Sequence, residues 1–241
     1  LLFAGYAPGL DAAQSSTIAL LTVDIVSVAL SDSDDTVAQV QAMGRRAHAV
    51  TADLTSIEPV ERVLAEALQA MGRVDILVNN AGLIRRADAV DFTEADWDLV
   101  MNINLKTVFF MSQAVARCFI KQGEGGKIIN IASMLSFQGG IRVPSYTASK
   151  SGVAGLTKLM ANEWAPHGIT ANAIAPGYFA TANTQALRED PVRSAEILGR
   201  IPAGRWGQPS DLGGAAVFLA SRASDYVQGA ILPVDGGWQA R

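Results

Sequence analysis

Residues 75–82 read Asp-Ile-Leu-Val-Asn-Asn-Ala-Gly, a short apolar run that gives way to amides, alanine and glycine. An apolar run of this length is typical of a buried parallel strand. In an open parallel sheet, ligands bind beyond the carboxyl ends of the strands, and small residues there let a ligand approach the backbone. The stretch therefore predicts a strand that ends at a binding edge.

Comparable apolar runs recur along the chain and alternate with segments of helical period. Strands are predicted at residues 1–4, 24–29, 48–51, 75–79, 127–132, 170–174 and 230–234. Capping-box patterns at residues 55–58 and 93–96 are expected to start helices, and Gly72 and Gly168 to stop them. The alternation predicts an α/β fold of one domain over residues 1–241, with a doubly wound parallel sheet in a three-layer α/β/α arrangement.

Composition limits the classes of function. With 241 residues, 49% of them hydrophobic, the chain can bury one large core. A net charge of -4 argues against a nucleic-acid surface, which needs clustered lysine and arginine. With one cysteine, Cys118, and two histidines, neither a disulfide framework nor a metal site is expected. Because we find no apolar run of about 18 residues and no signal-peptide pattern, we expect a cytoplasmic protein without a membrane partner.

One segment, residues 180–207, interrupts the regular alternation with mixed polarity. Long irregular segments in compact domains are often lids or binding loops. We therefore expect an irregular lid here, next to the carboxyl ends of the strands.

Three predicted strand ends carry residues suited to a dinucleotide. The glycine-containing turn after the first strand can bring backbone N–H groups to a pyrophosphate, although a ligand-free β-α turn explains that turn equally well by itself. An aspartate after the third strand can accept a hydrogen bond from an adenine amino group. The residues expected at this site are Gly5, Gly9, Leu10, Asp53, Leu54, Asn80, Ala81 and Gly82.

Tyr146 and Lys150 lie four residues apart in a predicted long helix, so that both side chains share one face. The pKa of a free tyrosine, about 10, is too high for a good base at neutral pH, but a nearby cation favours the phenolate. The spacing alone is equally typical of a structural tyrosine beside a solvated lysine. Ser133, at the end of the predicted strand 127–132, should project where that helix begins, and the three groups together indicate carbonyl chemistry.

Several motifs occur together in the order of one known family. They are Gly5-xxx-Gly9, Asn80-Ala81-Gly82, Asn104, Ser133, Tyr146-Thr147-Ala148-Ser149-Lys150 and Pro176-Gly177. Over nearly its whole length, the chain resembles the short-chain dehydrogenases/reductases. The resemblance implies a Rossmann-like fold, hydride transfer with a nicotinamide cofactor and a homotetramer.

The resemblance also implies residue roles. Tyr146 would be the general acid/base for the substrate oxygen, Lys150 its electrostatic partner, and Ser133 a hydrogen-bond donor to that oxygen. Asn104 would anchor a proton-relay water, although an asparagine that satisfies backbone groups inside a helix is the alternative. The further cofactor contacts that the resemblance implies are Tyr146, Lys150, Pro176, Gly177 and Thr181.

The first two predicted strands differ from the family pattern in ways that affect the cofactor. Asp11 replaces a third glycine, and a carboxylate there would repel a pyrophosphate. Ala29 and Leu30 stand where an acid would select NAD or an arginine NADP. The acids that follow favour NAD(H) and leave NADP(H) open; they are Asp32, Asp34 and Asp35.

Residues 80–86 and 133–142 carry a closer resemblance, to the bacterial 2-dehydro-3-deoxy-D-gluconate 5-dehydrogenases. It implies that the chain interconverts 2-dehydro-3-deoxy-D-gluconate and its 2,5-diketo form in uronate, pectin or alginate catabolism. For the carboxylate we expect that at least one of three arginines forms a clamp, with Arg142 favoured over Arg85 and Arg86. Gln138 is expected to read a hydroxyl group. Solvated surface arginines are the alternative. The full predicted substrate set is Ser133, Gln138, Arg142, Tyr146 and Arg85.

Two other functions remain open from the sequence. The chain could be a ketoreductase of another substrate, such as an acyl thioester or a polyol, because one fold hosts many substrates. It could also be a non-catalytic dinucleotide-binding protein, for which Asp11 is the one supporting observation.

Overall fold

The computed structural model describes residues 2–4, 23–31 and 33–241, and these contain one sheet of seven parallel strands. The order across the sheet is β3-β2-β1-β4-β5-β6-β7, so the chain winds outward from the centre in both directions. The strands are β1 (Leu2–Ala4), β2 (Ile25–Ala29), β3 (Ala47–Thr51), β4 (Ile76–Asn79), β5 (Gly126–Ile131), β6 (Ile169–Pro176) and β7 (Ile231–Val234). Each lies within two residues of its predicted position, and the doubly wound sheet is confirmed.

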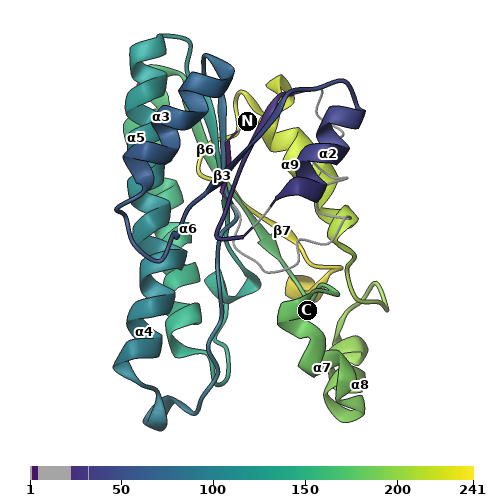
Figure 1. Ribbon diagram of the computed structural model, residues 1–241. Helices are drawn as coiled ribbons and strands as arrows, with labels where there is room; N and C mark the ends of the chain where they lie inside the picture. Colours follow the sequence, from purple (N-terminus) through teal and green to yellow (C-terminus); the bar gives the residue numbers. More distant parts are fainter. Residues whose placement is uncertain (1, 5–22, 32) are drawn as a thin grey trace.

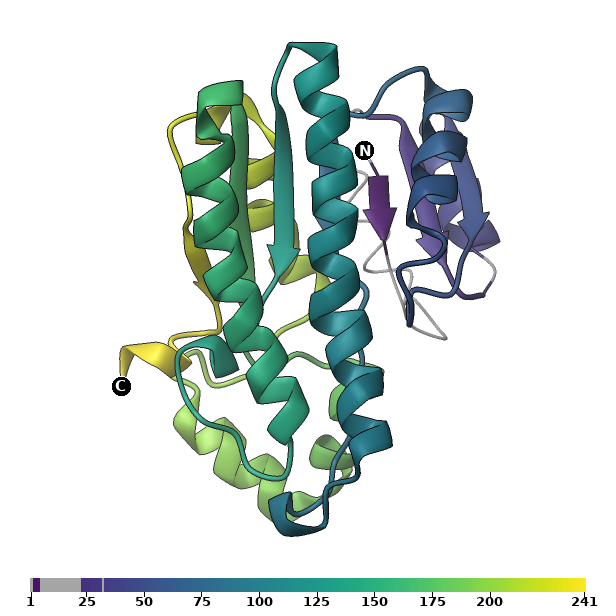
Figure 2. The ribbon, with the colours of Figure 1, turned by 90° about the vertical axis from the view of Figure 1, so that its left-hand side faces the viewer.

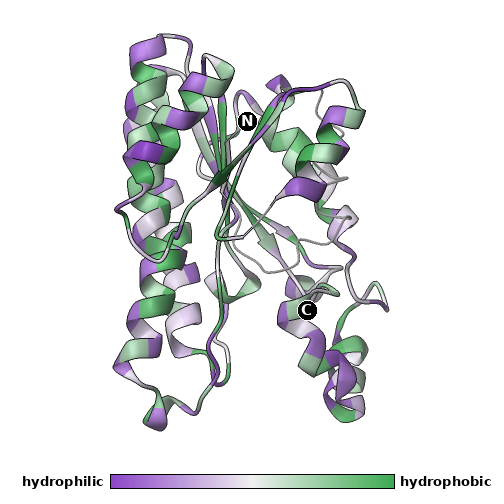
Figure 3. Ribbon diagram, viewed as in Figure 1, coloured by the Kyte–Doolittle hydropathy of each residue, from purple (hydrophilic) through white to green (hydrophobic). Residues whose placement is uncertain are grey.

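Helices cover both faces of this sheet, as Figures 1 and 2 show. One face carries α3, α5 and α6, and the other carries α2 and α9. The apolar sides of the helices face the strands in Figure 3, so each face has its own buried cluster and the three layers are confirmed. The helices are α2 (Asp34–Ala42), α3 (Val60–Met71), α4 (Glu94–Met101), α5 (Thr107–Gln122), α6 (Pro144–Trp164), α7 (Gln185–Glu189), α8 (Pro191–Arg200) and α9 (Gly213–Ala220).

The helix boundaries follow local chemistry, with one departure from expectation. Thr93 caps α4, because its side chain accepts a hydrogen bond from the Asp96 N–H. Gly72 and Gly168 adopt left-handed backbone at the ends of their helices, as predicted. The capping box predicted at residues 55–58 is wrong. Asp53 Oδ1 accepts hydrogen bonds from both the backbone and the hydroxyl of Thr55, which holds a turn, and α3 begins only at residue 60.

Helices α4 and α5 are joined by a short π-helix, η2 (Asn102–Lys106), in which the Thr107 N–H reaches back five residues to the Asn102 carbonyl. Within the continuous helical stretch Glu94–Gln122, one window of 18 residues has a mean hydropathy of 1.2. By length and composition alone, this stretch could cross a membrane. The sequence was expected to hold no such run. However, 56% of that window is buried inside the fold, and the core helix of a globular protein passes the same test.

The segment 180–207 is largely helical, so the expected irregular structure is wrong. It contains η5 (Ala182–Thr184), α7 and α8. Helix α8 has a well-formed start, because the Asp190 carboxylate accepts from two backbone N–H groups and Pro191 occupies the first helical position. These helices lie beyond the carboxyl ends of the strands (Figures 1 and 2).

Candidate active site

Three polar side chains meet beyond the carboxyl end of β5. Ser133 is 7% exposed and lies at the start of η3 (Met134–Ser136), where its Oγ accepts from the Leu135 N–H. Lys150, on α6, is 4% exposed, and its Nζ donates to the Ile131 carbonyl at 2.6 Å. The same Nζ lies 5.7 Å from the centre of the Tyr146 ring. The structure thus brings together the three residues that the sequence predicts for carbonyl chemistry.

Two hydrogen bonds join the first half of α6 to the segment that follows Ser133. The Ser136 hydroxyl donates to the Lys150 carbonyl at 2.6 Å, and the Ser151 hydroxyl donates to the Leu135 carbonyl at 3.2 Å. Pro144 at the first helical position pre-sets the backbone for the helix. These contacts hold the tyrosine and lysine in a defined position relative to the sheet edge.

Burial controls the protonation of this site. It lowers the pKa of Lys150 to about 8, because the buried ammonium loses its hydration. Burial also raises the pKa of Tyr146, and the hydrogen bond with Ser133 and the charge of Arg86 only partly oppose this effect. The phenolate is therefore not the favoured form in this structure, because burial outweighs the groups that oppose it. Tyr146 is held as a neutral phenol at neutral pH.

Asn104 lies in the π-helix η2 and is fully buried. Its Oδ1 accepts from the Leu83 N–H, and its Nδ2 donates to the Leu83 carbonyl, both at 2.9 Å. A third contact, at 3.3 Å, reaches the Ser149 hydroxyl. This is the backbone-satisfying arrangement that the sequence left open as the alternative for Asn104. A Cβ added at Gly82 would lie 3.1 Å from Asn104 Oδ1, so the backbone of Gly82 packs closely against the amide.

A cavity of about 440 Å³ opens beyond β4, β5 and β6. A Cβ at Gly177 would lie 2.7 Å from Asp235 Cα, so this part of the wall is necessarily backbone. Backbone walls with an ammonium and hydroxyls fit a nicotinamide dinucleotide, which lies against the protein backbone and presents ribose hydroxyls. The predicted residues that line the cavity are Asn80, Gly82, Ser133, Tyr146, Lys150, Pro176, Gly177 and Thr181.

Some predicted cofactor residues are not brought to this cavity. Leu54 and Ala81 are buried in the core cluster on the α3 side of the sheet, and Asp53 is exposed in its turn. The remaining predicted positions lie outside the described residues, as does the aspartate that replaces the third glycine of the family pattern; they are Gly5, Gly9, Leu10 and Asp11.

A second cavity, of about 460 Å³, adjoins the first and shares Ser133, Tyr146 and Gly177 with it. Its outer wall is built from α7 and α8. Gln138 lines it, as predicted for a substrate reader, and its Oε1 accepts from the Trp238 indole N–H at 3.2 Å. The two cavities therefore form one cleft with Tyr146 at their junction.

Two of the three candidate clamp arginines, Arg142 and Arg85, do not line the cleft, so the preference for Arg142 is wrong. The Arg142 side chain is 62% exposed, and its Nε lies 2.9 Å from Asp88. Arg85 Nε lies 3.2 Å from Asp96. Arg86, the third candidate, does line the second cavity, hereafter the substrate-side cavity. Arg193 and Arg200 line it as well, and both come from a helix that the sequence analysis did not place. The Asp-Pro pair that starts α8 was the signal that could have located that helix.

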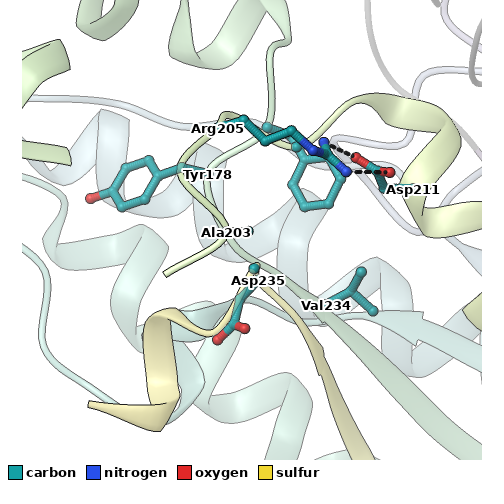
Figure 4. Close-up of a pocket in the computed structure, with 9 residues that line it drawn as sticks. Tyr178, Ala203, Arg205, Asp211, Val234 and Asp235 are labelled. Carbon is teal, nitrogen blue, oxygen red and sulfur yellow. Dashed lines mark hydrogen bonds and ion pairs between the residues drawn. The ribbon is translucent and has the colours of Figure 1, made fainter. Parts of the chain in front are cut away.

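A smaller pocket of about 190 Å³ lies between the base of the lid segment and β7 (Figure 4). Arg205 and Asp211 form a two-bond ion pair across it, at 2.7 and 3.0 Å, which lowers the pKa of Asp211 to about 2. Both carboxylate oxygens of Asp235 accept backbone N–H groups. The Tyr178 phenol points away from the ion pair. The charged side chains of this pocket therefore already have partners within the protein.

Several known proteins with a similar sequence or fold are dehydrogenases or reductases. The family model described as enoyl-(acyl carrier protein) reductase matches residues 13–239. The 2-dehydro-3-deoxy-D-gluconate 5-dehydrogenase of Escherichia coli strain K12 is 64% identical over 233 residues, which cover 97% of this chain and 92% of that protein.

Two crystal structures extend the comparison to the fold. One, from Agrobacterium tumefaciens with bound NADP and assigned as a 2-deoxy-D-gluconate 3-dehydrogenase, has a TM-score of 0.90 and 53% identity, covering 100% of this chain and 96% of that one. The other, a gluconate 5-dehydrogenase of Burkholderia cenocepacia in complex with NADP and tartrate, has a TM-score of 0.91 and 39% identity, covering 99% and 95%. The match over nearly the whole chain, together with the sheet order, means that this chain belongs to the short-chain dehydrogenase/reductase family and is an oxidoreductase.

Proposed function

We propose that this protein interconverts 2-dehydro-3-deoxy-D-gluconate and its 2,5-diketo form with a nicotinamide dinucleotide, in the breakdown of uronates from pectin or alginate. The observation that carries the proposal is the position of Tyr146, at the junction of two cavities and beside the buried Lys150. One cavity has the backbone-rich wall that a dinucleotide needs, and the other has cationic groups suited to an acid. The 64% identity to the Escherichia coli dehydrogenase of that substrate supports the assignment.

In the proposed reaction, the bound nicotinamide supplies or accepts the hydride. During reduction the neutral Tyr146 phenol donates its proton to the carbonyl oxygen and becomes a tyrosinate. During oxidation the tyrosinate accepts the hydroxyl proton of the substrate and becomes the phenol again. The Ser133 hydroxyl donates a hydrogen bond to the same oxygen, where negative charge develops. Lys150, with a pKa of about 8, carries its charge at neutral pH and stabilises the tyrosinate that forms.

We further propose that NAD(H) is preferred. Strand β2 ends at Ala29, and residues 30–42 contain three acids and no lysine or arginine that would hold a 2'-phosphate. Three solved relatives hold NADP, one of them at low occupancy, which is an observation against this preference. The ratio of kcat/KM for the two cofactors decides the question. A ratio that favours NADP(H) would remove the proposed preference and leave the hydride transfer itself intact.

The function is tested by following absorbance at 340 nm with NADH and NADPH against a panel of keto-uronates, neutral ketoses and acyl thioesters. We expect kcat/KM to be highest for the 2,5-diketo acid. Activity confined to neutral polyols or thioesters would assign the chain to another ketoreductase. The absence of both turnover and cofactor binding, followed by tryptophan fluorescence, would overturn the proposal.

Three broader properties are part of the same proposal: a lid function for residues 180–207, a homotetramer, and a cytoplasmic location. The assembly is tested by size-exclusion chromatography with light scattering. A homotetramer of this 25.3 kDa chain has four times that mass in solution. A monomeric mass for the active enzyme would contradict this part of the proposal.

A further inference from the structure

Three guanidinium groups converge on the substrate-side cavity from separate parts of the chain. Arg86 follows β4, whereas Arg193 and Arg200 lie seven residues apart on one face of α8. The cavity that they share also contains Ser133 and Tyr146. A ligand that reaches the reacting groups therefore lies in a space walled by three cations.

These cations are incompletely neutralised. Arg193 pairs with Glu196, at 2.5 Å. Arg86 donates to the Asn183 carbonyl at 3.0 Å, and Arg200 lies 4.1 Å from the centre of the Trp238 ring. Among the described residues, Glu196 is the one acidic side chain that lines this cavity. Three positive groups facing one negative group leave an excess of positive charge at this end of the cleft.

Tyr178 provides a second sign that the three cations converge. Its ring packs edge-on against Trp206 and Trp238, which fixes its orientation. Burial raises the pKa of Tyr178, and the charges of Arg193, Arg200 and Arg86 oppose that rise. One phenol thus lies within electrostatic reach of all three guanidinium groups. Tyr178 also lines the substrate-side cavity.

We propose that Arg86, Arg193 and Arg200, together with the Tyr178 hydroxyl, form the subsite that binds the carboxylate of the sugar-acid substrate. The proposal rests on the proposed function, and it replaces the clamp by Arg142 that the sequence favoured. Guanidinium groups bind carboxylates through paired, charge-assisted hydrogen bonds. Because Arg193 and Arg200 belong to α8, a bound carboxylate links the lid segment to Arg86 and determines which end of the sugar faces Tyr146.

The test compares two ligands of nearly equal shape, D-gluconate and its neutral amide, D-gluconamide, titrated against the cofactor-loaded enzyme. The fluorescence of Trp238 and Trp206 reports binding, because both rings contact Tyr178. We expect the acid to bind more tightly than the amide. Arg193→Gln should weaken binding of the acid roughly tenfold or more, as expected for the loss of a hydrogen bond between charged groups, and should leave the amide unchanged.

Matched variants separate this role from a general effect of removing charge. Arg142→Gln and Arg85→Gln each remove an arginine outside the cavity, and both should leave gluconate affinity within about twofold of wild type. Arg193→Lys keeps the charge but loses the paired geometry, so it should recover only part of the affinity. Arg86→Gln removes a cation that does not belong to α8. It should weaken gluconate binding as Arg193→Gln does, even if substitutions in α8 move that helix.

Several outcomes would overturn the subsite. They are equal affinity for acid and amide in the wild type, equal weakening of both ligands by Arg193→Gln, no saturable signal with gluconate, or much tighter binding of 6-phosphogluconate, which would indicate a phosphate site. The two proposals fail separately. Turnover of the keto acid with an unchanged KM in Arg193→Gln removes the subsite alone, whereas arginine-dependent gluconate binding without any turnover removes the proposed function alone.

Discussion

The two halves of the cleft are built in opposite ways. On the reacting side, Ser133, Lys150 and Asn104 are buried. Lys150 and Asn104 bind the backbone of neighbouring segments, and Ser133 binds the backbone of its own turn. On the substrate side, the three arginines are exposed. Arg86 contacts a carbonyl group, Arg200 an aromatic ring and Arg193 a carboxylate. The difference teaches that the backbone of the sheet edge determines where the chemistry occurs. In the proposed subsite, two of the three arginines belong to a separate helical segment, which can change without disturbing that edge.

Tyr146→Phe should produce the largest effect. Loss of the phenolic proton removes the general acid, and kcat should fall by about two to four orders of magnitude. The melting temperature and cofactor binding should stay close to wild type, because the ring still packs on the core. Tyr178→Phe, on the substrate side, is the matched control and should mainly raise KM. A Tyr146→Phe enzyme with nearly normal kcat would remove the reacting side from the chemistry.

Lys150→Met should separate activity from stability. Activity should fall at least about a hundredfold, as for the loss of an essential partner in proton transfer. At neutral pH the folded chain must bury the ammonium, so its removal should raise the melting temperature by a few degrees even though the Ile131 carbonyl loses a hydrogen bond.

This gain should depend on pH in a defined direction. The folded pKa of about 8 lies below the ordinary value of 10.5, so the unfolded chain binds more protons between these values. The contribution of Lys150 to wild-type stability therefore rises with pH above about 8. The difference in melting temperature between Lys150→Met and wild type should shrink from pH 7 to pH 10, as measured by differential scanning fluorimetry. A constant difference would contradict a depressed pKa.

Asn104→Ala tests whether the reacting side depends on its buried contacts. Both polar groups of Leu83 lose their partners, and unfolding should become easier by about 2–4 kcal/mol. Thermal denaturation should show a fall of several degrees. Gln138→Ala removes an amide of similar size from the substrate side and should shift the melting temperature by much less. Equal shifts in the two variants would contradict the contrast between the two halves.

Asp190→Ala should give the smallest effect and should act on the substrate side alone. The carboxylate caps α8, and loss of such a cap destabilises a helix by about 1 kcal/mol. We expect a severalfold rise in KM for the sugar acid with kcat nearly unchanged, measured by steady-state kinetics. A fall in kcat with KM unchanged would show that α8 also supports the reacting side.

The same contrast explains what could be predicted from the sequence. The strands and the convergence of Ser133 with Tyr146 and Lys150 depend on short motifs and on the rule that parallel strands end at one edge. Arg86 was among the candidates, but Arg193 and Arg200 were missed, because α8 meets residue 86 only after more than a hundred residues of chain have been folded. Arg142 was misplaced because proximity in sequence to Tyr146 does not specify where a side chain points, and Asp88 holds it outside the cleft.

The π-helix between α4 and α5 has a consequence for helical phase. Each residue of an α-helix advances by about 100°, so one extra residue in a turn rotates everything after it by that angle. Because of residues 102–106, the continuous helix α4-η2-α5 places Asn104 against Leu83 and also places Phe119 in the core. Deleting one residue here would rotate one of those faces away from its partner, whereas many substitutions would not. The number of residues in this segment, more than their identity, keeps the core and the site in register.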